Sequence, residues 1–154
     1  MSKSLLIIAH TPSINTRALA NAALRACKDE AAGKVKTTCL SPFDVKTGDL
    51  LAADAIVIGT SENIGYMAGA TKDMFDRCYN DWLDQTDGKP VGLYIRAGLD
   101  GTATIRALTG ICSGLRWRLV AEPLLLRGNW HPQFCDDVGR LCLGVAAGLD
   151  GGIF

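Results

Sequence analysis

The densest run of hydrogen-bonding side chains in the sequence lies near the amino terminus, at residues 11–16. Thr11, Ser13, Asn15 and Thr16 place three hydroxyls and one amide between an apolar stretch and the start of a helical pattern. Such groups can hydrogen-bond a phosphate, assisted by free backbone N–H groups and by the positive end of the helix dipole. An ordinary helix cap is the alternative, but a cap requires only one residue of this kind. The excess predicts a phosphate-binding loop that contains no lysine.

A second candidate is the segment of residues 60–69. Its glycines, Gly65 and Gly69, permit tight turns, and Tyr66 offers an aromatic face that can stack on a planar heterocycle. Alternatively, Tyr66 and Met67 pack beneath the segment as ordinary apolar side chains. Both a ring-binding loop and a tightly packed turn therefore stay open at this point.

Other polar and aromatic residues follow the later apolar stretches. Arg96 begins a segment at residues 96–101, where it can contact a ligand or only solvent. His10 and His131 follow expected strands, and a histidine beside a redox cofactor can deliver a proton to a substrate. The alternative for either is a loop histidine without a catalytic part. Trp130 forms either a pocket wall or a subunit contact, and no catalytic residue can be named.

The overall composition argues against several classes of function. The 16 basic and 16 acidic residues cancel, so no net field attracts the chain to nucleic acid or to an anionic membrane. The first apolar run, residues 5–9, is too short for a secretion signal or a membrane span, which predicts a cytoplasmic protein. The cysteines form no C-x-x-C pair, so we expect no metal and interpret them as reduced thiols. They are Cys27, Cys39, Cys78, Cys112, Cys135 and Cys142.

Apolar stretches and helical patterns alternate along the 154 residues. This rhythm predicts a single α/β domain, with a parallel sheet covered by helices on both faces. We expect strands at residues 5–9, 35–40, 55–59, 91–95 and 118–126. We expect helices at residues 17–31, 70–83, 102–113 and 136–149, with a loop and one helical turn at 41–53. In such a sheet the ligand site lies beyond the carboxyl ends of the strands, where the loops at 10–16, 60–69 and 96–101 would meet.

The run Thr11-Pro12-Ser13-Ile14-Asn15-Thr16 resembles the flavodoxin phosphate loop, which follows an S/T-x-T-G-x-T pattern. Ile14 stands where flavodoxins usually have glycine. Together with Ala18-Leu19-Ala20, the run is also similar to the loop and helix start of NADPH-dependent FMN reductases. The resemblance implies a flavodoxin-like three-layer sandwich, with a five-stranded parallel sheet in the strand order 2-1-3-4-5. It also implies that Thr11, Ser13, Ile14, Asn15 and Thr16 bind flavin mononucleotide (FMN).

Residues 59–69 resemble the G-T-P-x-x-x-G-x-M-x-G segment of flavin-dependent NAD(P)H:quinone oxidoreductases, and the likeness continues through Lys72, Phe75, Asp76 and Arg77. The resemblance implies contacts to the isoalloxazine ring from Ser61, Glu62, Asn63, Ile64, Gly65, Tyr66 and Met67. Glu62 would disfavour an anionic reduced flavin unless its carboxylate points to solvent. The pair Ala97-Gly98 stands where these relatives have T-G, so we also expect flavin contacts from Arg96, Ala97, Gly98 and Leu99.

These resemblances imply an FMN-dependent oxidoreductase that takes hydride from NAD(P)H and passes electrons to a quinone or to flavin. One alternative is an electron-carrier flavodoxin, a class that is usually strongly acidic, unlike this chain. The other is a flavodoxin-like domain that binds flavin weakly or not at all. Related reductases form dimers or tetramers, so we expect a homo-oligomer by resemblance.

Overall fold

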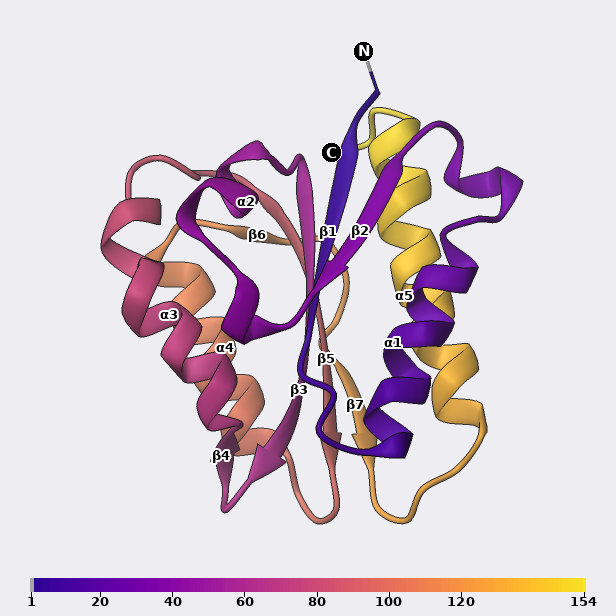
Figure 1. The fold of residues 1–154 in the computed structure, drawn as a ribbon, viewed down its shortest axis with the longest axis vertical. Helices are drawn as coiled ribbons and strands as arrows, with labels where there is room; N and C mark the ends of the chain where they lie inside the picture. The colour runs from indigo at the N-terminus through magenta and orange to yellow at the C-terminus, as the bar shows by residue number, and fades with distance from the viewer. Residues whose placement is uncertain (1) are drawn as a thin grey trace.

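The computed structural model describes residues 2–154. They form three layers, with a β-sheet between two layers of helices (Figure 1). Helices α1 and α5 cover one face of the sheet, and α3 and α4 cover the other. The strands are β1 (Ser4–Ala9), β2 (Lys36–Leu40), β3 (Ala55–Asn63), β4 (Tyr66–Met67), β5 (Pro90–Ala97), β6 (Arg118–Leu119) and β7 (Leu124–Arg127). The helices are α1 (Ile14–Ala26), α2 (Thr47–Ala52), α3 (Gly69–Trp82), α4 (Thr102–Gly114) and α5 (Gln133–Asp150), with 3-10 turns at Glu30–Ala32 and Pro42–Asp44.

The sheet follows the order β2-β1-β3-β5-β6, and all pairings along this path are parallel. Strand β7 also pairs with β5 in parallel, and β4 lies antiparallel to the end of β3. In β1, Ile7 lies between Cys39 of β2 and Val57 of β3. Such inner strands are apolar along their whole length because helices bury both of their faces.

The two faces of the sheet have different cores. Beneath α3 and α4, the strands pack against Phe75, Trp82 and Trp117, whose ring centroids lie 5.9 to 6.2 Å apart. Beneath α1 and α5, the ring of Tyr94 lies across Gly59 of β3, where a Cβ atom would overlap the ring. Glycine is therefore required at residue 59, directly below the strand end that leads to residues 60–69.

The segment at 60–69, expected as a loop, instead forms a hairpin. Strand β3 continues to Asn63, and the chain turns back through β4 before α3. The expected final strand at 118–126 is divided into β6 and β7 by a stretch that contains Pro123, which has no N–H to donate to a strand ladder. Residues 2–154 thus form seven strands where five were expected. The order is β2-β1-β3-β5-β6 and not the expected 2-1-3-4-5, because the fourth strand along the chain is the hairpin strand β4.

Helix boundaries also differ from the sequence expectation. The helix expected at 17–31 starts earlier, as α1 at Ile14, and ends at Ala26, before a separate 3-10 turn. The stretch at 41–53 contains both a 3-10 turn and α2. No helix within residues 2–154 is long and apolar enough to cross a membrane. In the same part of the chain, no cluster of three His, Cys, Asp or Glu residues could hold a metal ion.

Candidate functional site at the carboxyl ends of the strands

The candidate segments meet at one edge of the sheet, at the bottom of Figure 1, where β1, β3, β5 and β7 end. Residues 10–13 connect β1 to α1, and residues 98–101 connect β5 to α4. The hairpin of residues 62–67 is formed by the end of β3 and by β4. Strands β1, β3, β5 and β7 are parallel, so their carboxyl ends lie together at this edge of the sheet.

The loop before α1 is held by a capping box. Ser13 is the N-cap, and its Oγ accepts a hydrogen bond of 3.1 Å from the Thr16 backbone N–H. In return, the Thr16 hydroxyl accepts a bond of 3.0 Å from the Ser13 backbone N–H. This reciprocal pair satisfies two donors that a helix start otherwise leaves free. Two of the three hydroxyls predicted to bind phosphate, those of Ser13 and Thr16, are therefore already engaged within the loop.

The first turn of α1 nevertheless keeps free donors. Within residues 2–154, nothing accepts a hydrogen bond from the backbone N–H of Ile14 or Asn15. The first turn contains no acidic residue, and the Asn15 side chain is exposed. Free N–H groups at a helix start form an anion site when an anion is supplied.

The hairpin that follows β3 turns through two residues with positive φ, Ile64 at 52° and Gly65 at 74°. This is the conformation of the tight two-residue turn that matches the twist of paired strands. Positive φ is unusual for a β-branched residue and costs conformational energy. The Ile64 side chain is fully exposed at the tip, so packing does not account for an isoleucine at this strained backbone position.

Contacts to both neighbouring helices hold the hairpin in place. The Glu62 carboxylate accepts hydrogen bonds from the Gly101 backbone N–H at 3.0 Å and from the Thr104 hydroxyl at 2.6 Å. These bonds hold the negative charge of Glu62 at the start of α4, where the positive end of the helix dipole stabilises it. On the other side, the Thr71 hydroxyl of α3 donates to the Thr60 hydroxyl at 2.9 Å. Glu62 therefore ties the hairpin to α4, a structural role that the sequence did not reveal.

Large apolar side chains are exposed around this edge of the sheet. The exposed fraction is 82% for Ile14, 86% for Leu99, 64% for Phe43 and 40% for Tyr66. Together with Ile64, these residues lie on four connections at this edge, and we call them the apolar rim. Clusters of exposed apolar side chains on a folded protein mark sites of binding.

The residues predicted to contact the flavin ring differ in how exposed they are. Met67 and Ala97 are buried, whereas Asn63 and Gly98 are exposed. The Ser61 hydroxyl donates to the Asn63 side chain at 3.1 Å. The edge thus brings the three predicted segments together, but only part of each segment faces outward.

The two histidines have different environments. His10 packs edge-on against Phe43, with ring centroids 6.2 Å apart, and burial lowers its pKa below the ordinary value. His131 accepts a hydrogen bond of 3.0 Å at Nδ1 from the Gln133 backbone N–H at the start of α5. This bond gives His131 a structural role in the connection that leads into α5. Phe43, which sequence reasoning overlooked, has no nearby motif that would have identified it.

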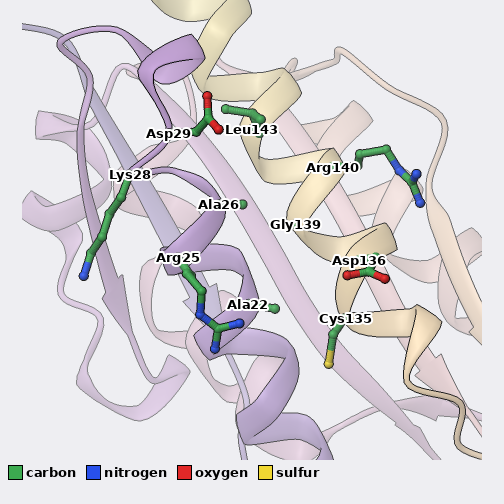
Figure 2. Close-up of a pocket in the computed structure, with 10 residues that line it drawn as sticks. All are labelled: Ala22, Arg25, Ala26, Lys28, Asp29, Cys135, Asp136, Gly139, Arg140 and Leu143. Carbon is green, nitrogen blue, oxygen red and sulfur yellow. The ribbon is translucent and has the colours of Figure 1, made fainter.

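A groove of about 620 Å³ lies between α1 and α5, away from this edge (Figure 2). At its floor the helices approach closely, because Gly139 lies against Ala26. Cys135 lines the groove, and burial raises the pKa of its thiol, which keeps it in the unreactive form. None of the predicted site residues lines this groove.

No protein-family model matches the sequence, and no curated protein matches it either. Solved structures do match. A flavodoxin from the domain Archaea superimposes with a TM-score of 0.79 at 20% identity, over 96% of this chain and 99% of that one. The fold is flavodoxin-like.

Two further structures agree with this fold. An oxidoreductase from Corynebacterium diphtheriae matches with a TM-score of 0.70 at 20% identity, over 96% of each chain. A flavodoxin, WrbA-like protein from Agrobacterium tumefaciens matches with a TM-score of 0.70 at 16% identity, over 96% of this chain and 97% of that one. At these identities the likeness concerns the flavodoxin-like fold alone.

Proposed function

We propose that this protein binds FMN at the carboxyl ends of β1, β3 and β5 and uses NAD(P)H to reduce quinones or flavin. The observation that carries the proposal is the start of α1, where the Ile14 and Asn15 N–H groups have no acceptor within residues 2–154. A phosphate dianion would satisfy both donors at the positive end of the helix dipole. No acidic side chain in the first turn would repel it.

The apolar rim supports the ring half of the proposal. Ile64 and Tyr66 expose apolar surface on the hairpin at the end of β3, and Leu99 does so on the connection that follows β5. A planar ring placed there would cover that surface, and Tyr66 can stack on it. The Glu62 carboxylate is directed to α4, where hydrogen bonds from Gly101 and Thr104 compensate its negative charge. When bound, FMN supplies the hydride and electron transfer, while the chain binds and orients it.

The side-chain part of the phosphate contact is tested with Asn15→Ala, which removes the exposed Asn15 amide and keeps both backbone N–H donors. Loss of a hydrogen bond to a charged group is expected to weaken FMN about tenfold, whereas riboflavin, which has no phosphate, is expected to bind as before. Flavin fluorescence titration measures both affinities. Asn21→Ala is the matched control, because Asn21 is exposed on the same helix beyond its first turn. Thr16→Ala is less suitable, since Thr16 also holds the capping box.

The visible spectrum of the purified protein tests flavin binding as a whole. We expect flavin absorption bands and release of FMN on denaturation. Colourless protein that also fails to bind added FMN at micromolar concentration would contradict the proposal. Oxidation of NAD(P)H with a quinone acceptor then separates a reductase from an electron carrier, which would not turn over.

A further inference from the structure

Arg96, at the carboxyl end of β5, carries a charge that the structure leaves uncompensated. Its Nη1 atom donates to the backbone oxygens of Ala97 at 2.8 Å and Leu126 at 3.1 Å. Arg116 and Arg127, in contrast, contact aspartates. Considering residues 2–154 only, Arg96 forms no salt bridge, and its Nε and Nη2 atoms donate no hydrogen bond. The free Nε and Nη2 atoms form the edge of a guanidinium that binds an oxyanion through two parallel hydrogen bonds.

The guanidinium is held in a fixed position by two aromatic rings. It lies 5.1 Å from the ring centroid of Phe134 and 5.9 Å from that of Trp130. The two rings pack edge to face, with centroids 5.7 Å apart. Partial burial lowers the pKa of Arg96, but a guanidinium stays charged at neutral pH. With both its position and its Nη1 atom constrained, the group would lose little conformational freedom on binding a ligand.

This donor edge is separate from the start of α1. Strand β3 lies between β1 and β5, so two strand spacings, about 10 Å in all, separate the strand that leads to α1 from the strand that carries Arg96. The bond to Leu126 further directs the Arg96 side chain toward β7, on the far side of β5 from β1. An oxyanion at Arg96 would therefore be a different group from a phosphate at Ile14 and Asn15.

We infer that Arg96 binds a carboxylate or phosphate group of a small-molecule substrate other than the flavin. Phe134 and Trp130 act as positioning residues, because their rings lie against the guanidinium. Oxyanion binding by Arg96 does not depend on flavin. Its role in holding a redox substrate beside the ring rests on the proposed function.

The experiment titrates benzoate, and separately inorganic phosphate, into full-length protein with and without saturating FMN. Chemical shifts of the Trp130 indole N–H and the Arg96 Nε–H report binding. We expect both anions to bind with and without FMN, and Arg96→Gln to raise both dissociation constants about tenfold or more. Arg96→Lys is expected to restore only part of the affinity, because lysine lacks the two-donor edge. Arg106→Gln, an exposed arginine on α4, is the control and should bind like the wild type.

Two results would overturn the inference. One is anion binding that Arg96→Gln does not weaken. The other is a fall in FMN affinity without a fall in riboflavin affinity in Arg96→Gln, which would assign the donor edge to the flavin phosphate. If the protein fails to bind FMN but loses benzoate binding in Arg96→Gln, the flavin proposal fails and the oxyanion site stands.

Discussion

The loop before α1 and the hairpin after β3 lie at the same edge of the sheet, but they are stabilised in different ways. In the loop, the Ser13 and Thr16 hydrogen bonds join residues three positions apart. In the hairpin, Glu62 reaches partners 39 and 42 positions away, Gly101 and Thr104. The loop can therefore form with its own helix, whereas the hairpin requires α4 to be in place. This difference separates local from tertiary stabilisation within one candidate site.

Among the variants that test this difference, Glu62→Ala should cause the largest loss of unfolding free energy. The substitution leaves the buried Gly101 N–H and Thr104 hydroxyl without their acceptor, which costs about 2 kcal/mol of unfolding free energy. Urea denaturation followed by circular dichroism measures this loss. Glu122→Ala, at an exposed glutamate in the connection between β6 and β7, is the control. Equal stability of the two variants would show that the hairpin does not depend on its tie to α4.

Ser13→Ala should have a smaller effect, because it removes only the N-cap of α1. The expected loss is about 1 kcal/mol of unfolding free energy. Amide hydrogen exchange should show faster exchange in the first turn of α1 and no change in the hairpin. Ser113→Ala, at an exposed serine near the end of α4, provides the comparison. Faster exchange in residues 62–67 would contradict independent stabilisation of the two regions.

Ile64→Asn should stabilise the protein by roughly 0.5 to 1 kcal/mol, because asparagine tolerates positive φ better than a β-branched residue does. The same substitution removes apolar surface from the rim, so flavin affinity should fall. Thermal unfolding and flavin titration measure the two effects. Ile153→Asn is the control, since Ile153 is exposed without positive φ. A stability gain without a loss of flavin affinity would remove Ile64 from the proposed ring contacts.

His10 should contribute the smallest effect, a pH dependence of stability near neutral pH. Burial lowers the pKa of His10 in the folded state, while the unfolded chain titrates near pH 6.5. The unfolded state therefore binds more protons in this interval, so stability falls as the pH decreases from about 7.5 through 6.5 toward the folded-state pKa. Urea denaturation of His10→Gln should show a weaker decrease than the wild type. Parallel curves would contradict the assignment.

Much of the fold was accessible from local patterns. The apolar run at residues 5–9 forms the buried strand β1, and the helical pattern from Ala70 to Leu83 corresponds to α3. The hairpin was missed because Gly65 supplies only one of its two positive-φ residues, and Ile64 at the other is contrary to local preference. The division of the last strand was missed because Pro123 indicates a break without showing where pairing to β5 resumes.

The sequence by itself determined the loop at 11–16 as a helix start rich in hydrogen-bonding groups, because capping acts between residues three positions apart. The same local bonds engage Ser13 and Thr16 with each other, and within residues 2–154 the Ile14 and Asn15 N–H groups have no acceptor. Only the tertiary structure decided that Glu62 is directed to α4 and Arg96 toward Leu126, Trp130 and Phe134. A side chain's partners across the sheet depend on strand order and register, and spacing along the chain does not contain that information.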